Sequence, residues 1–380
     1  MILIDLQKAF DTIDHQILLK KLEHIGFSSS SIRWFESYLE NRTFSVQVED
    51  SLSSPGMLAC GVPQGSILGP LLFLLYVNDM SQAVTCDLLL YADDSCLVFE
   101  GNDISEIEAQ LNKDFNSLCD WFVDNKLSIH FGEDKTKSIL FGTNRKLKNL
   151  RDIDIRRGDI KIKQHAQVVY LGCTLDRNLS GAAMATQALG KINGRLKFLY
   201  RKQSFLTPSF KRMLCNALIQ PHFDFANLAW YINLNKKLKK KLQTSQNKCI
   251  RFCLGMENRD HVGAAEFKKI NWLPTRERFE QSLLTSIYKF FNDLAPAYYS
   301  EIYCPMKQTQ ATRFSFQKLV LQCQNTNRGL RTINYLGPRL WNALPQTIKA
   351  AGSVKSFKHK IKDAFFAALK KREDNPYIFY

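Results

Sequence analysis

The chain has 380 residues, 45% of them hydrophobic, and its formal net charge at pH 7 is +16. That length gives material for two or three domains and a sizeable core. The longest apolar run, residues 67–77, is too short to cross a bilayer, which excludes a transmembrane helix built on it.

The charge is divided unevenly along the chain. Residues 1–150 hold 12 Lys and Arg against 21 Asp and Glu, a net charge of −9, whereas residues 151–380 hold 40 against 15, a net charge of +25. An acidic half followed by a strongly basic half suits a protein that holds metal ions at one end and a phosphate backbone at the other. A solvated basic surface without a partner is the alternative, which so large a split disfavours.

The first acidic motif follows an apolar run. Residues 1–4 are apolar and lead to Asp5, which predicts a strand that ends in a carboxylate. A helix-like stretch follows over residues 12–24, and a serine run at residues 28–31 can cap a second helix. Residues 43–48 then alternate in polarity as a strand does.

A glycine-containing stretch, G-V-P-Q-G-S at residues 61–66, comes next and leads into apolar sequence. Gly65 allows close approach of the backbone to a ligand. Gln64 offers a neutral donor and acceptor for a sugar hydroxyl or a base edge.

Two apolar runs meet at adjacent carboxylates within residues 88–99. This pattern predicts a buried β-hairpin whose turn carries Asp93 and Asp94. Because neighbouring carboxylates repel each other unless a cation neutralises them, the pattern favours a metal site over the alternative, an ordinary turn. With Asp5 they form a candidate cluster for two magnesium ions roughly 4 Å apart, which is the chemistry of a polymerase or nuclease.

A long amphipathic helix is predicted after the hairpin. Apolar residues recur there at helical spacing, and they are Ile104, Ile107, Leu111, Phe115, Leu118 and Phe122. Helices that alternate with short strands predict an α+β fold, an antiparallel sheet covered on one face by helices.

Three motifs in this order carry a family resemblance. D-x-x-x-A-F-D at residues 5–11, G-V-P-Q-G-S at residues 61–66 and Y-A-D-D at residues 91–94 resemble motifs A, B and C of reverse transcriptases, particularly those of animal non-LTR retrotransposons of the LINE-like, jockey type. Each motif alone is moderately specific, whereas all three in this order and spacing are strongly so. The resemblance covers about residues 1–255, and the remainder more loosely.

The resemblance implies an RNA-directed DNA polymerase, which adds deoxynucleotides to the 3′-hydroxyl of a DNA primer on an RNA template. It implies that Asp5 and Asp93 hold two Mg²⁺ ions, with Mn²⁺ as a substitute. Asp94 would support them, and the backbone carbonyl of Leu6 would complete a metal shell.

The same resemblance implies a nucleotide pocket lined by Gln64 and Gly65. It makes Phe10 the steric gate against a ribose 2′-hydroxyl, although from the sequence alone a core aromatic is the better prediction for Phe10.

Two looser motifs follow. Residues 125–141 resemble motif D, whose lysine, here Lys135, would protonate the departing pyrophosphate. Lys137 and a merely solvated lysine remain alternatives. Residues 167–176 resemble motif E, the primer grip. The residues expected to form this grip are Tyr170, Leu171 and Gly172.

Basic amphipathic helices at residues 191–202 and 236–241 resemble the thumb, which contacts the phosphates of the template–primer duplex. The sequence from about residue 256 resembles the segment that follows the polymerase in animal non-LTR elements, where we expect packing and RNA docking. The predicted architecture is thus α+β: a polymerase palm over 1–165, a primer grip and helical thumb over 166–255, and a mostly helical region over 256–380.

The ten cysteines predict free thiols rather than disulfides, because most lie in apolar sequence and no signal peptide is evident. We therefore expect a reducing, intracellular compartment, nucleus or cytoplasm, and no membrane partner; the oligomeric state stays open. Zinc binding by Cys249, Cys253 and His261 is a weaker alternative, because no fourth ligand is evident.

Met1 lies four residues before Asp5, whereas in reverse transcriptases the fingers, which grip the triphosphate, precede this motif. We expect an N-terminally truncated copy or a gene start placed late, and hence a chain that binds an RNA–DNA duplex but extends a primer poorly. A catalytically inactive nucleic-acid-binding remnant is one alternative. An RNA-dependent RNA polymerase is a weaker one, because Gly is expected there in place of Ala92.

Overall fold

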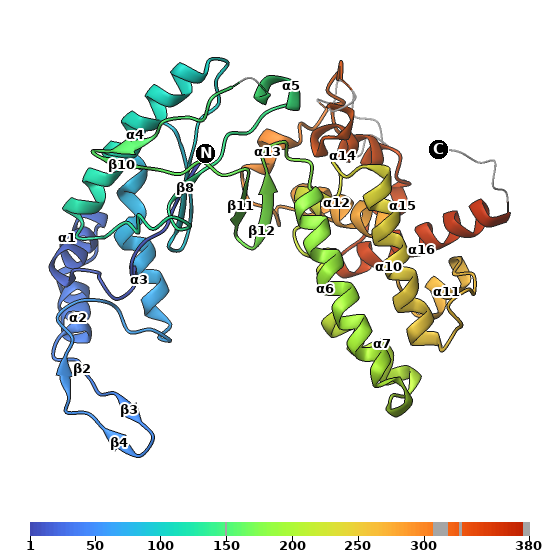
Figure 1. Cartoon of the computed structure of the whole chain (residues 1–380), viewed down its shortest axis with the longest axis horizontal. Helices are drawn as coiled ribbons and strands as arrows, with labels where there is room; N and C mark the ends of the chain where they lie inside the picture. Colours follow the sequence, from blue (N-terminus) through green and yellow to red (C-terminus); the bar gives the residue numbers. More distant parts are fainter. Residues whose placement is uncertain (149, 307–317, 327–328, 375–380) are drawn as a thin grey trace. The chain divides into compact units, whose positions relative to one another are not determined.

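The computed structural model describes residues 1–148, 150–306, 318–326 and 329–374. They fold into two compact units, Met1–Gly172 and Cys173–Tyr380. Each unit has its own hydrophobic core. The secondary structure is a mixture of helices and small antiparallel sheets, as the sequence predicts (Figure 1).

The first unit is built on a four-stranded antiparallel sheet in the order β6-β7-β1-β8. Its strands are β1 (Ile2–Ile4), β6 (Asp87–Tyr91), β7 (Asp94–Val98) and β8 (Lys137–Ser138). The central strand β1 is buried at every residue, whereas the edge strand β6 is not buried at any. The expected buried hairpin is therefore correct for β7 and wrong for β6, because an edge strand keeps one side open to solvent.

The first unit also contains five α-helices and one 3-10 helix among its described residues. They are α1 (His15–Ile25), α2 (Ser29–Leu39), α3 (Leu68–Val77), the 3-10 helix η1 (Asn78–Ala83), α4 (Ile104–Asp124) and α5 (Asn144–Leu147). The hydroxyl of Ser28 caps α2, as the serine run predicts. The first helix begins at residue 15 rather than 12, because the carboxylate of Asp14 caps it by accepting a bond from the backbone of Ile17.

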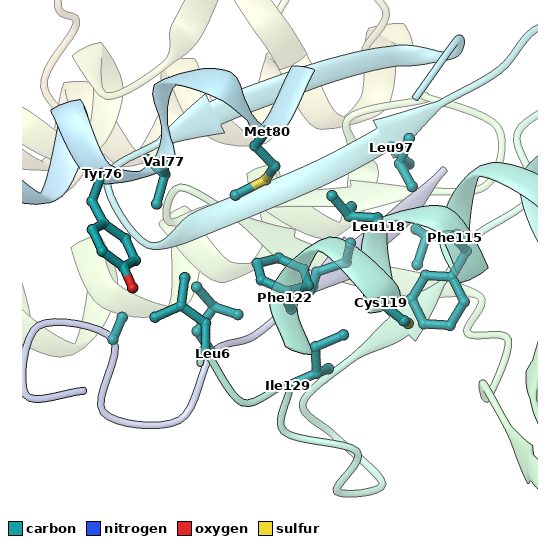
Figure 2. Close-up of a cluster of buried hydrophobic side chains, with 14 of the residues drawn as sticks. Leu6, Tyr76, Val77, Met80, Leu97, Phe115, Leu118, Cys119, Phe122 and Ile129 are labelled. Carbon is teal, nitrogen blue, oxygen red and sulfur yellow. The ribbon is translucent and has the colours of Figure 1, made fainter. Parts of the chain in front are cut away.

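The core of the first unit lies between α4, the sheet and α3. The predicted apolar face of α4 is buried at Leu111, Phe115, Leu118 and Phe122. Figure 2 shows Phe115, Leu118 and Phe122 with Leu97 of β7 and with side chains from distant segments. Leu6, which directly follows Asp5, belongs to the same cluster, so the first acidic motif is anchored in the core.

Asp114, on the inner face of α4, is a buried carboxylate held by hydrogen bonds alone. It is 2% exposed and accepts bonds from the backbone N–H groups of Thr85 and Cys86 at 2.9 and 2.6 Å, and from the Thr85 hydroxyl at 3.0 Å. Burial would raise the pKa of Asp114, but the bonds from Cys86 and Thr85 outweigh it and hold the pKa below its ordinary value. The carboxylate thus joins α4 to the segment that enters β6.

A two-part β-ribbon follows α2 and protrudes beyond it (Figure 1). Its strands are β2 (Thr43–Phe44), β3 (Gln47–Val48), β4 (Ser51–Leu52) and β5 (Gly56–Met57), with β2 paired to β5 and β3 to β4. The single strand expected over residues 43–48 is thus two short ones. The ladder is interrupted because the Val46 N–H donates to the hydroxyl of Ser53 rather than to a backbone carbonyl.

Three further strands complete the first unit: β9 (Arg156–Arg157), β10 (Ile160–Lys161) and β11 (Gln167–Tyr170).

The second unit is mostly helical, as predicted for the basic half. After β12 (Cys173–Asp176) its helices are α6 (Ala182–Arg201), η2 (Gln203–Phe205), α7 (Pro208–Leu218), α8 (Pro221–Asp224), α9 (Asn227–Trp230), α10 (Lys236–Leu254), α11 (Ala264–Lys269), α12 (Thr275–Phe291), α13 (Tyr299–Ile302), η3 (Gly329–Arg331), α14 (Ile333–Asn342), α15 (Gln346–Lys349) and α16 (Val354–Asp374). One core cluster joins α10 to α6 and α7, and another joins α12 to α14 and α16. The boundary between the two units falls in the turn between β11 and β12.

All ten cysteines are free thiols, and seven of them are buried. Cys249 and Cys253 lie in the core of the second unit, whereas His261 is exposed. No described helix is both long and apolar enough to cross a lipid bilayer.

Candidate active site

Strand register brings the predicted carboxylates to one end of the first unit's sheet. The β1–β7 register pairs Ile4 with Ser95, so Asp5, which follows Ile4, and Asp94, which precedes Ser95, lie at the same end of these neighbouring strands. The β6–β7 register pairs Tyr91 with Asp94 and leaves Ala92 and Asp93 as the connection. The prediction that the turn carries both aspartates is therefore correct for Asp93 and wrong for Asp94, which begins β7.

The turn itself is strained. Ala92 has φ +52°, in the left-handed region that favours glycine. A tight two-residue hairpin needs positive φ at its first position, so the register of the hairpin forces this conformation on an alanine. The strain costs roughly 1–2 kcal/mol, which the paired strands on either side offset. The position of Asp93 is thus set by the strands before any ligand binds.

The three carboxylates act on one another electrostatically. The pKa of Asp94 is raised by partial desolvation and, in addition, by the negative charges of Asp93 and Asp5. The ammonium of Lys135 lies 3.5 Å from the carboxylate of Asp5. Lys135, the predicted motif D lysine, therefore lies beside Asp5, the predicted motif A aspartate. Its ammonium brings a positive charge to the otherwise acidic end of the sheet.

The backbone around Asp5 is fixed on both sides. Its N–H donates to the hydroxyl of Thr136 at 3.3 Å, and its carbonyl accepts from the N–H of His130 at 2.8 Å. Leu6, the next residue, forms a β-bridge with Ile129 and buries its side chain in the core (Figure 2). The strand end that carries Asp5 is thus positioned by residues of the predicted motif D.

Within the described residues, no three His, Cys, Asp or Glu side chains surround a common point as they would around a bound metal ion. The oxygen donors are nevertheless of the kind that Mg²⁺ prefers. The pKa of Asp94 is raised first by burial and then by the charges of Asp93 and Asp5, and the ammonium of Lys135 already lies beside the carboxylate of Asp5. The donor chemistry of Asp5, Asp93 and Asp94 therefore fits divalent cations.

The glycine-containing stretch packs directly on the first acidic motif. Gly61 has φ +87°, and a Cβ added to it would lie 2.8 Å from the carbonyl oxygen of Asp11, so no larger residue fits without displacing the backbone. The amide of Gln64 donates to the carboxylate of Asp11 at 2.8 Å. Gly65 has φ +80° and open space where a Cβ would stand. Motifs A and B are thus one packed assembly.

A cavity of about 300 Å³ lies at this junction. Its wall includes Asp11, His15, Arg42 and Gln64, but neither Gly65 nor Phe10. The guanidinium of Arg42 lies 4.6 Å from the centre of the Tyr38 ring, which holds a positive charge at the edge of the cavity.

The structure gives Phe10 features of both predictions made for it, the steric gate and the core aromatic. Its side chain is half-buried and packs on the core, with its ring centre 4.6 Å from that of Phe73 on α3. A half-buried ring is neither a fully enclosed core residue nor a free one, so the exposed part of Phe10 remains available to a ligand.

Residues 1–175 match the family described as "Reverse transcriptase (RNA-dependent DNA polymerase)". The match begins before Asp5 and ends within the predicted motif E, after Gly172, so it includes every carboxylate discussed above. Residues 1–175 are a reverse transcriptase domain.

Relatives of the chain are retrotransposon proteins from Drosophila melanogaster. The chain is 29% identical over 263 residues to the "Probable RNA-directed DNA polymerase from transposon BS", an alignment that covers 66% of this chain and 28% of the relative. It is 26% identical to the "Probable RNA-directed DNA polymerase from transposon X-element", over 70% of this chain and 30% of the relative. It is 28% identical to the "RNA-directed DNA polymerase from mobile element jockey", over 65% of this chain and 27% of the relative. The chain thus spans less than a third of the length of these curated relatives.

Tyr170, near the end of the reverse transcriptase domain, lies close to Cys96 and Asp94 of β7. Burial raises the pKa of Tyr170 to about 12, and the Cys96 thiol and the negative charge of Asp94 add to this effect. Leu171 and Gly172 follow with φ +47° and +75°, a left-handed pair that makes a tight turn. Of the predicted primer-grip residues, Tyr170 thus lies near the acidic site, and the other two form an exposed turn.

Sequence reasoning missed two residues of this domain that hold the site together. Asp11 bonds Gln64 and contacts Gly61, and Thr136 bonds the backbone of Asp5. Asp11 is the last letter of D-x-x-x-A-F-D, so the motif itself contained the signal. Thr136 lies within the predicted motif D, but nothing in that pattern marks its bond to Asp5, because the bond depends on where β8 joins the sheet.

Proposed function

We propose that the chain carries the catalytic centre of an RNA-directed DNA polymerase from a non-LTR retroelement. Its substrates are an RNA template, a DNA primer and deoxynucleoside triphosphates. The observation that carries the proposal is the β6-β7-β1 register, which gathers Asp5, Asp93 and Asp94 at one end of a sheet in a reverse transcriptase domain. In this proposal residues 1–165 act as the palm, 166–255 as primer grip and thumb, and 256–380 as a docking region.

Each acidic residue has a part in this proposal. Asp5 and Asp93 would hold two Mg²⁺ ions, and Asp94 together with the carbonyl of Leu6 would support them. The ions, when bound, would activate the primer 3′-hydroxyl and neutralise the charge that develops on the phosphates. Asp5, Asp93 and Asp94 contribute charge and position, since the strand register holds them at one sheet end.

Lys135 has a separate role in the proposed reaction. In nucleotidyl transfer the primer 3′-hydroxyl loses its proton to solvent and its oxygen bonds to the α-phosphorus of the nucleotide, while the bond to the pyrophosphate oxygen breaks and that oxygen gains a proton. The Lys135 side chain is about half exposed and therefore free to leave Asp5. We assign it the role of donating this proton, which suits a mobile ammonium near developing negative charge.

Sugar selection is assigned to Phe10. Replacing Phe10 with Ala should raise incorporation of ribonucleotides relative to deoxynucleotides, because removing the half-buried ring opens space for a 2′-hydroxyl. The measurement is the ratio of kcat/KM for the two nucleotide types on one RNA template. Phe10→Tyr, which keeps a ring against Phe73, is the matched control and should leave the ratio close to the unaltered value. If Phe10→Ala lowers both rates and the melting temperature together, Phe10 is a core aromatic instead.

Duplex binding is assigned to the basic helices α6 and α10. Lys236, Lys237, Lys240 and Lys241 are exposed on α10, and none of them forms an ion pair with a described residue. Lys239 differs, because its ammonium lies 5.1 Å from the centre of the Tyr231 ring and donates to the carbonyl of Ile232. The exposed lysines are therefore available to phosphates, and Lys239 is not.

We expect affinity for an RNA–DNA duplex to fall steeply with salt. Each lysine contact that is lost should lower the slope of log affinity against log salt by roughly one. Lys241→Ala should do so, whereas Lys239→Ala should leave the slope unchanged and affect stability instead. Filter binding at several salt concentrations measures both. A slope near zero for the unaltered chain would mean that the basic half is only a solvated surface.

A further inference from the structure

A cavity in the second unit has no part in the polymerase proposal. Its volume is about 700 Å³, within the size range of small-ligand sites. Its wall is formed by the end of α7, by α8, by the segments on either side of α12, by α12 itself and by α16. All of these elements belong to residues 173–380.

Gln220 is the unexplained residue of this wall. Its side chain is 4% exposed, yet neither its amide nitrogen nor its amide oxygen has a hydrogen-bond partner among the described residues. Leaving such a group unbonded costs roughly 1–3 kcal/mol, so a buried free amide calls for a partner. An amide offers one donor edge and one acceptor edge, as the hydrogen-bonding edge of a nucleobase requires.

The rest of the wall is positively charged. Its charged residues are Asp224, Arg278, Lys289, Lys358 and Lys362. Arg278 and Asp224 neutralise each other through two bonds of 2.6 and 2.5 Å, which leaves the three lysines in excess.

Two of these lysines belong to a stripe that continues outside the cavity. Lys355, Lys358 and Lys362 are spaced by three and four residues on α16 and therefore share one face of the helix. Lys362 is half-buried and its ammonium donates to the carbonyl of Asn271 at 2.5 Å, so that Lys355 and Lys358, which are exposed, are the free lysines of this row. Such a row of lysines can contact successive phosphates of a nucleic-acid strand, whereas a free nucleotide would contact only the lysines that line the cavity.

We propose that this cavity receives one unstacked nucleotide of a single-stranded nucleic acid, with its base against Gln220 and its backbone along the lysine stripe of α16. The occupant is defined by the two chemistries that the cavity offers, an amide for a base edge and ammonium groups for phosphate.

Photo-crosslinking of the full chain tests the proposal directly. The probe is a short single-stranded RNA of mixed sequence that carries thiolated bases, and crosslinked peptides are identified by mass spectrometry. We expect crosslinks within residues 216–224, 271–299 and 358–362, unchanged in the Asp93→Asn chain, whose carboxylate belongs to the other unit. Crosslinks confined to other segments would overturn the proposal.

Fluorescence anisotropy with the same RNA tests the residues. Gln220→Leu should weaken binding roughly tenfold without lowering the melting temperature, because it removes an unbonded buried amide. Lys358→Ala should weaken binding and reduce its salt dependence. Lys360→Ala is the matched control, because Lys360 lies on the same helix but donates to the carbonyl of Thr347 and does not line the cavity. Equal effects of Lys358→Ala and Lys360→Ala would overturn the proposal, and so would full affinity in Gln220→Leu. If Gln220→Leu fails to fold, the lysine pair and the crosslinks decide.

Competitors distinguish the sources of the nucleotide. A DNA strand of the same sequence, the four nucleoside monophosphates and inorganic phosphate are each added to the labelled RNA. Displacement by strands at far lower concentration than by monophosphates supports the proposal. Equal displacement by inorganic phosphate and by monophosphates would show an anion site without base recognition and would overturn it.

Discussion

Replacing Asp93 with Asn should abolish primer extension on an RNA template while leaving duplex affinity intact. Asp93 lies in the strained turn between β6 and β7, where the strands fix its position. An amide there keeps the shape of the turn but removes a charge on which metal binding depends. Loss of one preorganised electrostatic group lowers kcat by roughly 100-fold to 1,000-fold, and more is expected when metal binding is lost as well.

The control for this prediction is on the same hairpin. Asp87 lies at the opposite end of β6 and is exposed, so Asp87→Asn changes the net charge equally without reaching the site. Extension and duplex anisotropy are measured for both variants. Binding of Mn²⁺, followed by electron paramagnetic resonance, adds a readout that does not depend on extension. Unchanged extension or unchanged Mn²⁺ binding in Asp93→Asn would contradict the assignment.

Replacing Asp114 with Ala should destabilise the first unit by roughly 2–4 kcal/mol, because it leaves the buried N–H of Cys86 and the groups of Thr85 without their acceptor. Denaturant unfolding of the chain measures this change. Asp120→Ala is the matched control on the same helix. The side chain of Asp120 is 64% exposed and pairs with Arg157 at the surface, so its loss should cost less than about 1 kcal/mol.

The pH dependence of stability gives Asp114 a second signature. Because its pKa in the folded protein lies below the ordinary value, its contribution is complete above the unfolded pKa of about 3.9 and is lost as pH falls through the lower folded pKa. Asp114→Asn should lack that acid-induced loss. An Asp114→Asn variant that loses stability with acid as the unaltered chain does would show that other carboxylates cause the loss.

The prediction of elements from sequence succeeded where periodicity and caps are local. Ser28 begins a helix because its hydroxyl caps that helix, and α4 buries the face that its spacing predicts. The edge position of β6 and the split of residues 43–48 into two strands could not be predicted, because each depends on which strand lies alongside.

Some residues of the candidate site could also be predicted from the sequence, and others could not. The motifs name Asp5, Asp93 and Asp94, since each is marked by the apolar run beside it. The contact of Lys135 with Asp5 and the role of Thr136 depend on residues far apart in the chain that a sheet brings together. The buried amide of Gln220 has no sequence signature at all, because only the packing around it shows that it lacks a partner.

The position of β1 in the sheet has a consequence for biosynthesis. Ile2 pairs on one side with Leu97 and on the other with Ser138, so the central strand is made long before either neighbour. At roughly 5–20 residues per second, several seconds pass on the ribosome before β1 has both partners. During that time an apolar strand exposes two open edges, which invites wrong pairing or chaperone binding. Asp5 therefore leaves the ribosome well before the fold that positions it exists, and a nascent chain released before residue 138 should aggregate rather than bind metal.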